Sequence, residues 1–403
     1  MPGLSTAEMK IVEACEGEPM LDQVLSWAAV NSGSRNLDGL AAMAAIYSGA
    51  FAALPGELTL AQAAPVDAMD GDGSLKALQH GQNLHLTVRP EAPVQLLFTG
   101  HMDTVYGVDH PFQTLTWLED GILNGPGVAD MKGGIAVMLA ALRAVETAPE
   151  ARQLGYEVVI NSDEEVGSPG SAPLLRQAAQ GKKAALTYEP STLPDGTLAG
   201  ARPGSGNFSI FIQGRSAHAG RNPEEGRNAI VAAADLALRL AKAKGPRLSI
   251  NPARIEGGSP NNVVPEQAVL RVNMRPFTPE DEKRARAALE AAVAMVEAEH
   301  EVEIRLHGGF GRPPKPLDAQ AGKLFALVKN CGADLGQTID WRPTGGVCDG
   351  NNIAACGVPV VDTMGVRGGA IHSSQEYLIV ESLVERAKLS ALTIQRLASG
   401  EDL

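Results

Sequence analysis

Cysteines, aromatic residues and long apolar runs are all scarce in this chain. The four cysteines (Cys15, Cys331, Cys348 and Cys356) show no CxxC spacing, so we expect free or buried thiols in a reducing compartment. The longest apolar run, residues 135–142, is far shorter than the ~20 residues that cross a bilayer. These absences exclude a disulfide-stapled secreted domain and a helical membrane span.

Clusters of basic residues are missing as well. The formal net charge is −13 and there is no run of Lys or Arg, so neither nucleic acid nor a membrane surface is an expected partner. The first residues show no basic stretch followed by an apolar core; instead Ser5 and Glu8 fit a capping box that opens a helix. We therefore expect a cytoplasmic protein.

Length and composition favour a two-domain α/β protein. A chain of 403 residues exceeds the size at which a single hydrophobic core stops growing. Hydrophobic residues make up 44% and charged residues 20%, which is an ordinary balance for a globular protein. Gly (44) and Pro (26) are plentiful while aromatics make up only 4%, which favours many tight connections over an all-helical bundle.

Hydrophobic periodicity predicts the elements of a first domain. Residues 5–54 have a helical period that is broken near residue 31. Short apolar runs at 94–99, 157–161, 184–188 and 359–364 are predicted as buried strands, with helices at 134–145 and 172–179. This alternation predicts a largely parallel sheet that is covered by helices on both faces.

The region from residue 207 to about residue 310 has a different character. It predicts strand, helix, strand, strand, helix and strand at 208–213, 228–242, 249–255, 267–274, 279–299 and 302–306. That order is typical of a small ferredoxin-like α+β domain, and the Pro-rich residues 311–316 resemble a linker back to the first domain. We therefore expect a discontinuous first domain, 1–206 and 317–403, with a second domain, 207–316, inserted in it.

Polar side chains follow the predicted strands of the first domain. In an open α/β sheet, the binding crevice lies beyond the carboxyl ends of the strands. The residues that follow the four strands, or precede the helix at 134–145, are His101, Asp103, Asp130, Glu164, Glu165, Glu189 and His372. Two histidines and several carboxylates are thus expected to converge on one edge of the sheet.

This set of residue types is typical of a metal site. Imidazole and carboxylate ligands together suit Zn²⁺ or a similar divalent ion. If two ions share Asp130 as a bridge, Asp130, Glu165 and Glu189 offset three of the four positive charges. Asp103 lies two residues beyond His101 on the same face of an extended segment, where it can accept the second imidazole N–H of His101.

The adjacent residues Glu164 and Glu165 can divide two roles, in which one binds metal and the other transfers a proton as general base. Less specific interpretations stay open, because an Asp-Glu-Glu run is commonly a solvated turn. The Gly-rich residues 125–134 precede a helix and could cradle a phosphate, but they lack the GxxxxGKS/T spacing. Structural or surface roles are expected for the histidines His80, His85, His110, His300 and His307.

At these residues the sequence resembles the M20 metallopeptidase family, and within it the glutamate carboxypeptidase branch. The matching stretches are GHMDTVY at 100–106, GPGVADMKGG at 125–134, NSDEEVGS at 161–168, YEP at 188–190, GRSAHAG at 214–220 and IHS at 371–373. They occur in the family's order over nearly the whole chain. The resemblance implies a zinc-peptidase-like three-layer catalytic domain with an inserted lid and dimerisation domain.

The resemblance also implies specific roles in a centre of two zinc ions, with cobalt or manganese as alternatives. Asp130 would bridge the ions and would be followed by a non-proline cis peptide. The remaining ligands would be His101 and Glu189 for one ion, and Glu165 and His372 for the other. Glu164 would be the general base, and Asp103 would be the partner of His101.

For the inserted domain, the resemblance implies a homodimer in which His218 enters the partner's active site and stabilises the oxyanion. Arg275 and Asn262 match residues that hold the terminal carboxylate of the substrate, and a guanidinium suits that task. Gly345 and Gly346 begin a loop, 345–351, that lines the substrate pocket in relatives. Cys348 departs from the small hydroxyl residue of the family pattern in this loop.

The predicted function is therefore hydrolysis of an amide bond in an N-acyl amino acid or small peptide with a free carboxylate. Release of a C-terminal glutamate is one form of that reaction. The alternative is a biosynthetic deacylase for N-acetyl or N-succinyl amino acids. An aminopeptidase is disfavoured by the carboxylate-binding Arg275, and a non-catalytic binding protein is disfavoured by the intact Glu164 and complete ligand set.

Overall fold

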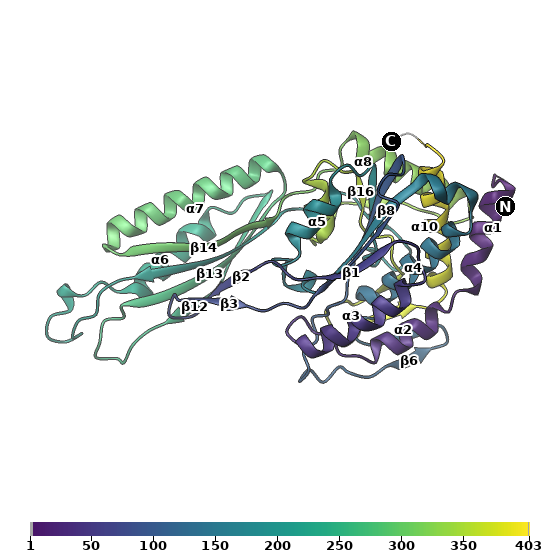
Figure 1. Cartoon of the computed structure of the whole chain (residues 1–403). Helices are drawn as coiled ribbons and strands as arrows, with labels where there is room; N and C mark the ends of the chain where they lie inside the picture. The colour runs from purple at the N-terminus through teal and green to yellow at the C-terminus, as the bar shows by residue number, and fades with distance from the viewer. Residues whose placement is uncertain (1–2, 402) are drawn as a thin grey trace.

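The computed structural model describes residues 3–401 and 403, which form two lobes (Figure 1). The larger lobe contains both ends of the described chain. The narrower lobe contains the helices α6 (Ala229–Lys242) and α7 (Pro279–His300). No described helix combines the length and the apolar character that crossing a membrane requires.

A mixed six-stranded sheet forms the centre of the larger lobe. Its four parallel strands match the four predicted ones, although the last is only two residues long and is followed by a single isolated bridge between Thr363 and Tyr188. The strands β4 and β1, which the sequence did not reveal, extend the sheet beyond β8; β4 is antiparallel to both of its neighbours, so β1 runs in the same direction as β8. In sheet order the strands are β1 (Glu57–Ala61), β4 (Asn83–Val88), β8 (Leu154–Asn161), β5 (Val94–His101), β9 (Ala184–Thr187) and β16 (Val360–Val361).

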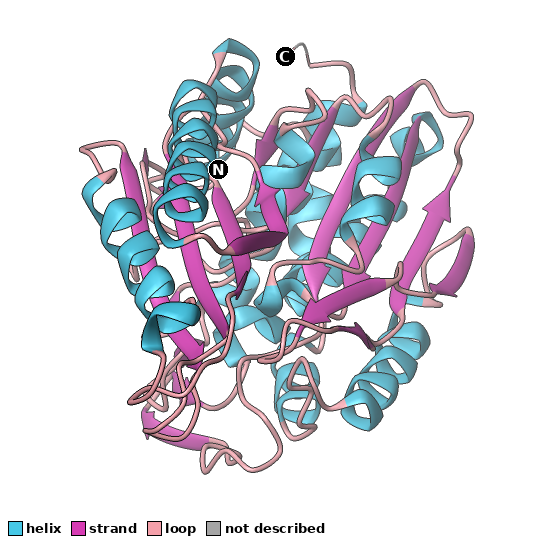
Figure 2. Cartoon of the chain, turned by 90° about the vertical axis from the view of Figure 1, so that its left-hand side faces the viewer, coloured by secondary structure: helices cyan, strands magenta, loops and turns pink. Residues whose placement is uncertain are grey.

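Helices cover both faces of this sheet, as expected (Figure 2). Alternate residues of β5 point to opposite faces, so Leu96 and Phe98 lie in the main core while Leu97 lies in the second. The helices of the main core are α1 (Thr6–Ala14), α2 (Met20–Ala28), α3 (Leu37–Phe51), α4 (Gly133–Glu146), α8 (Ala319–Asp334) and α10 (Ser382–Ala398). The second core is covered by α5 (Ala172–Ala179) and α9 (Asp349–Ala354).

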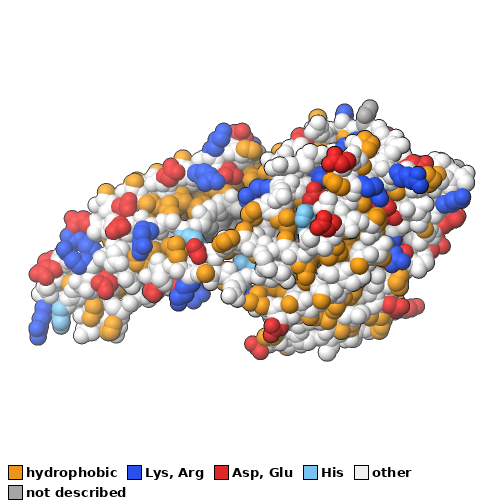
Figure 3. Space-filling model, viewed as in Figure 1, with side chains coloured by type: hydrophobic (Ala, Val, Ile, Leu, Met, Phe, Trp, Pro, Cys, Tyr) orange, Lys and Arg blue, Asp and Glu red, His pale blue; other side chains and the backbone are white. Residues whose placement is uncertain are grey.

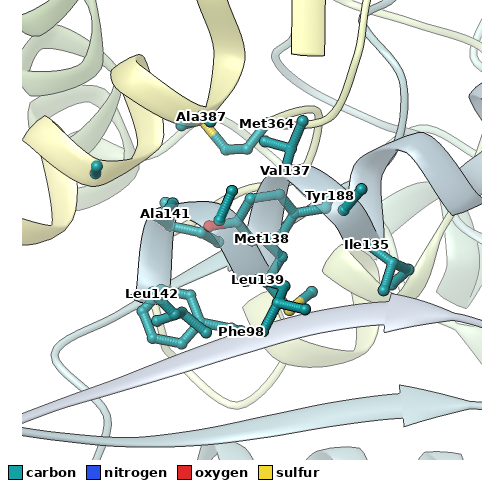
Figure 4. Close-up of a cluster of buried hydrophobic side chains, with 14 of the residues drawn as sticks. Phe98, Ile135, Val137, Met138, Leu139, Ala141, Leu142, Tyr188, Met364 and Ala387 are labelled. Atoms are coloured by element: carbon teal, nitrogen blue, oxygen red, sulfur yellow. The ribbon is translucent and has the colours of Figure 1, made fainter. Parts of the chain in front are cut away.

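Helix α4 is buried along nearly its whole length (Figure 4). Its side chains contact Phe98 of β5 on one side and lie next to Ala387 of α10 on the other. Gly134 lets the first turn approach the end of β9, because a Cβ there would lie 2.0 Å from the carbonyl oxygen of Tyr188. The start of α4 is thereby fixed beside the strand ends.

The second lobe has the predicted α+β arrangement. Its sheet is antiparallel, with β11 and β13 at the centre, and its apolar face packs against α6 and α7. The strands are β11 (Ser205–Gln213), β12 (Leu248–Gly257), β13 (Gln267–Pro276) and β14 (Glu303–Arg312). Strand β14 continues through Arg312, so two residues that we expected in the Pro-rich linker belong to the sheet instead.

Several smaller elements were not predicted. The hairpin of β2 (Val66–Met69) and β3 (Leu75–Leu78) extends from the larger lobe to the sheet of the second lobe. A four-stranded sheet contains β17 (Gly368–Gly369), β18 (Tyr377–Ile379), β7 (Ile122–Asn124) and β6 (Thr116–Glu119). The strands β10 (Leu198–Ala199) and β15 (Trp341–Arg342) pair in parallel. The expected capping box forms, since Glu8 N donates to Ser5 Oγ and Ser5 N to the Glu8 carboxylate.

Candidate metal centre

Four of the expected site residues lie at the carboxyl ends of three neighbouring parallel strands. His101 is the last residue of β5, and Glu189 lies two residues beyond β9. Glu164 and Glu165 lie in a 3-10 turn, η4 (Glu164–Val166), that follows β8. The strands pair in the order β8, β5, β9, which brings these side chains together at one edge of the sheet.

Asp130 and His372 complete the group from two loops. Asp130 lies in the turn η2 (Val128–Lys132), directly before α4, and its peptide bond to Met131 is cis, as expected. His372 follows β17 and has a φ of +61°, a conformation that is uncommon for a residue other than glycine. Its side chain is 54% exposed, so the group opens to solvent on this side.

Asp130 lies between the two histidines. Its Oδ1 is 3.2 Å from Nε2 of His101, and its Oδ2 is 3.3 Å from Nε2 of His372. Glu189 Oε2 lies 3.7 Å from the same nitrogen of His101, while Glu165 Oε2 lies 3.1 Å from that of His372. One carboxylate thus faces two clusters, each with one histidine and one further carboxylate.

The group fits a pair of divalent cations. Donor atoms of His101, Asp130 and Glu165 all lie within 4.8 Å of one another, as do those of His101, Glu164 and Glu189. Among the described residues, the buried Oε1 of Glu189 has no hydrogen-bond partner. Burial and the charge of Asp130 raise the pKa of Glu165 to about 7, and a cation bound beside it would offset this crowding of carboxylates.

Asp103 supports both the histidine and the turn that bears the glutamates. Nδ1 of His101 lies 2.9 Å from the backbone oxygen of Asp103 and 3.4 Å from its carboxylate Oδ1. The carboxylate also accepts hydrogen bonds from the backbone N–H groups of Glu164 and Glu165 and from Ser34 Oγ. The hydrogen bond of His101 Nδ1 therefore goes to the backbone oxygen of Asp103 and not, as expected, to its carboxylate, which instead fixes the position of the two glutamates.

The carboxylate of Glu164 contacts a buried arginine that the sequence did not reveal. Nη2 of Arg312 lies 2.7 Å from Glu164 Oε1 and donates to the backbone oxygen of Glu164 and to Ser168 Oγ. The side chains of Arg312 and Glu164 are only 7% and 9% exposed. Because Arg312 ends β14, the last strand of the second lobe directly contacts the expected general base.

A second unpredicted residue, Glu376, organises the turn that carries Asp130. Its Oε1 accepts hydrogen bonds from the backbone N–H groups of Ala129 and Asp130, each at 3.0 Å. Its Oε2 accepts from Gly127 N at 3.3 Å and from Tyr106 Oη at 2.8 Å. Glu376 follows His372 by four residues, and that proximity was the only sequence signal for it.

Both connections between the lobes are anchored on one buried carboxylate. Arg202 donates to Asp362 through Nε and Nη2, at 2.7 and 3.0 Å, and Lys315 Nζ lies 2.9 Å from the same carboxylate. Arg202 and Lys315 also exchange two backbone hydrogen bonds. Although burial opposes ionisation, the two cations hold the pKa of Asp362 below its usual range. This ion cluster fixes where the second lobe leaves the first.

The candidate metal-binding group described above, called the metal cluster below, opens into a pocket of about 650 Å³. Arg275 and Gly346 line it, as does Cys348, while Gly345 accepts a hydrogen bond from Arg275 Nη1 at 3.0 Å. Cys348 is buried, and burial raises the pKa of its thiol well above the usual range. A thiol that stays protonated is a weak nucleophile, so we do not expect Cys348 to act as one.

His218 and Asn262 do not line this pocket in the single chain. They lie beside each other on the second lobe, where Ala219 N donates to Asn262 O and His218 forms a bridge with Val263. Both side chains are exposed, and the only described contact of the His218 ring is with Gly220 N. Within one chain, the structure therefore does not bring these two residues to the metal cluster.

Comparison with known proteins agrees with this geometry. The sequence profile of peptidase family M20/M25/M40 matches residues 97–396. Carboxypeptidase G2 of Pseudomonas sp. (strain RS-16) is 32% identical over 332 residues, which cover 80% of this chain and 78% of that protein. The chain belongs to peptidase family M20/M25/M40. It is accordingly a metal-dependent hydrolase.

Other family members differ in the reaction that their names describe. Succinyl-diaminopimelate desuccinylase of Xanthomonas oryzae pv. oryzae (strain PXO99A) is 29% identical, and the match covers 78% of this chain and 86% of that protein. Aminopeptidase PepT of Bacillus cereus ATCC 10987 matches with a TM-score of 0.70 at 25% identity, covering 94% of this chain and 98% of that one.

A further solved structure is the YXEP protein of Bacillus subtilis, described as a dinuclear metal binding peptidase from the M20 family. It matches with a TM-score of 0.65 at 15% identity, covering 94% of this chain and 97% of that one. Together with the likeness to aminopeptidase PepT, this match confirms the predicted fold class.

Proposed function

We propose that this protein hydrolyses the amide bond of an N-acyl amino acid or small peptide that carries a free carboxylate. Release of a C-terminal glutamate is one form of this reaction. The proposal is carried by one observation: Arg275, a guanidinium without a carboxylate partner among residues 3–401 and 403, lines the same pocket as the metal cluster. A guanidinium placed there suits the free carboxylate of such a substrate.

In this proposal His101, Asp130 and Glu189 hold one zinc ion, and Asp130, Glu165 and His372 hold the other. Cobalt or manganese could take the place of zinc. Bound ions would supply Lewis acidity at the carbonyl oxygen and lower the pKa of a nearby water.

The protein's own residues then orient the substrate and move a proton. Arg275 and the backbone at Gly345 and Gly346 would hold the terminal carboxylate against one wall of the pocket. The Glu164 carboxylate would take a proton from the attacking water and deliver it to the nitrogen of the leaving amine, which balances the hydrolysis. Asp103 and Arg312 would keep Glu164 in position through the contacts described above.

We also propose that the protein acts as a homodimer through its second lobe. The exposed neighbours His218 and Asn262 would then reach the partner's pocket, where His218 would donate to the oxyanion and Asn262 to the substrate's carboxylate. Mixing the inactive variants His218→Ala and Glu164→Gln should restore part of the activity, since each mixed dimer would contain one site with both residues. Light scattering that gives the mass of a monomer, or mixtures that stay inactive, would contradict this arrangement.

The alternative is a deacylase for N-acetyl or N-succinyl amino acids, which is favoured by the 29% identity to the Xanthomonas desuccinylase. A substrate panel separates these functions. Protein with added zinc would be given acetyl-, succinyl- and benzoyl-amino acids, N-acyl glutamates, and dipeptides with free or blocked amino termini. We expect hydrolysis of blocked substrates that have a free carboxylate. Activity only on dipeptides with a free amino terminus would instead identify an aminopeptidase.

A further inference from the structure

A second cleft, of about 660 Å³, adjoins the active-site pocket. Four residues line both: Glu165, Arg275, Arg312 and Val347. From this shared wall the second cleft extends along the sheet of the second lobe, beneath the β2–β3 hairpin and beside the segment that leads into α5. Figure 3 shows Lys and Arg side chains on both sides of the waist between the lobes.

Hydrogen-bonded polar side chains form the floor of this cleft. They lie on the sheet face opposite α6 and α7. Asn273 Oδ1 accepts from Arg275 Nε at 3.1 Å, and Asn273 Nδ2 donates to Ser205 Oγ at 3.1 Å. Farther along, Arg271 donates to Ser209 Oγ at 2.6 Å. These contacts hold a polar surface in a fixed arrangement before any ligand binds.

The opposite wall is also fixed by the fold. Met69 of the β2–β3 hairpin packs with Phe211 and Val269 of the second lobe in a small buried cluster. Nε2 of His307 lies 2.9 Å from the backbone oxygen of Asp67, at the other end of β2. The hairpin is therefore tied to the sheet at two points, and the cleft between them is part of the folded structure.

The charge of the cleft is opposite to that of the whole protein. The chain has a net charge of −13, yet five arginines and one histidine line this cleft against two carboxylates, Asp67 and Glu165. Arg35, Arg176 and Arg275 have no carboxylate partner in the part of the chain that the structure describes. The other two arginines, Arg271 and Arg312, are paired with Glu256 and Glu164, although the Nε of the buried Arg312 has no hydrogen-bond partner among the same residues. Guanidinium groups left unpaired in one cleft are suited to an anion with several carboxylates.

We propose that this cleft is a distal subsite for a short acidic peptide chain. The proposal rests on the hydrolytic function proposed above, because it places one carboxylate of the substrate on Arg275 at the shared wall. Further carboxylates of the same substrate then extend along the cleft to Arg176 and Arg35. The ligand class is an acylated oligopeptide with acidic side chains, and its neutral analogue would lose these ion pairs.

Calorimetric titration tests this directly, with the Glu164→Gln protein and added zinc so that the ligand is not hydrolysed. The probes are the N-acetylated trimer of glutamate and the same trimer with carboxamides in place of its side-chain carboxylates. We expect the acidic trimer to bind about tenfold more tightly, the size of effect that a retained charge-assisted contact gives. Adding Arg35→Gln and Arg176→Gln should remove this preference, and Arg176→Lys should preserve part of it.

Arg152→Gln is the matched control, because Arg152 is exposed, lies in the turn η3 (Pro149–Gln153) and lines neither cleft. An unchanged preference in the Arg35→Gln/Arg176→Gln variant would overturn the subsite, and so would an equal loss in the control. Binding is measured without turnover, so a subsite can be found even if the wild-type protein hydrolyses nothing in the substrate panel. If the wild-type protein hydrolyses substrates of that panel but the Glu164→Gln protein binds both trimers equally, the subsite is overturned and the proposed function stands.

Discussion

Replacing Glu376 by alanine should destabilise the protein and weaken its metal site together. The Glu376 side chain is fully buried and accepts hydrogen bonds from three backbone N–H groups and from the hydroxyl of Tyr106. Each buried donor that loses its acceptor costs about 1–3 kcal/mol. Because water can enter the space and the turn can relax, we expect a net loss of about 3–5 kcal/mol rather than the full sum.

The effect on the metal site follows from which groups lose their partner. Two of the orphaned N–H groups belong to Ala129 and Asp130, so the backbone that positions Asp130, the proposed bridging ligand, loses its support. Loss of such supporting contacts lowers metal affinity by roughly 10- to 100-fold. Glu376→Gln keeps the volume and one acceptor oxygen, so its losses should be intermediate.

Urea unfolding followed by circular dichroism measures the stability, and competition with a chromogenic chelator measures zinc affinity. Glu381→Ala is the control, because the Glu381 side chain is 76% exposed and lies nearby in the sequence. The reasoning is refuted if Glu376→Ala has the wild-type urea midpoint, or if it is destabilised while zinc affinity stays unchanged.

Three further predictions test other parts of the structure. Glu164→Gln should lower kcat by roughly 10²- to 10⁴-fold while the zinc content measured by mass spectrometry stays at the wild-type level; retained turnover would remove Glu164 as the general base. Arg312→Ala should lower kcat about tenfold, because the carboxylate of Glu164 loses its buried partner. Arg312→Lys should recover part of the lost kcat, and an Arg312→Lys variant whose kcat equals that of Arg312→Ala would contradict a positioning role. Burial acts to raise the pKa of the Glu8 carboxyl, but its contacts with Arg396 and Ser5 hold that pKa below its usual value. The ionised carboxylate therefore stabilises the folded state at pH values above the unfolded pKa of about 4.3. This stabilisation is lost as the pH falls through the lower pKa of the folded state. Wild type should therefore lose about 1 kcal/mol more than Glu8→Gln in urea unfolding between neutral and strongly acidic pH, and parallel pH profiles would contradict this.

The part of the site that could be predicted from sequence is the part that strand ends determine. His101, Glu164 and Glu189 each follow a short apolar run, and parallel strands place the residues after such runs at one edge of the sheet. Asp130 was expected there because it directly precedes the helix at 134–145, and the order of the family motifs added its cis peptide, which no periodicity indicates.

The remaining features depend on contacts between segments that are distant in the sequence. Arg312 contacts Glu164 across 148 residues, and Glu376 contacts Asp130 across 246, so neither pairing leaves a local pattern. The β2–β3 hairpin was missed because its strands are short and largely exposed, with no apolar run to mark them. Lone charged residues near a loop carry little information until the fold places their partners.

The central claim is a centre of two metal ions bridged by Asp130, and metal stoichiometry tests it most directly. Protein saturated with zinc and then dialysed would be analysed by inductively coupled plasma mass spectrometry, beside the Asp130→Ala variant. We predict two zinc ions per wild-type chain and fewer than one in Asp130→Ala, because both ions lose a ligand at once. A wild-type chain that holds one ion or none, or a variant that keeps two, would contradict the account.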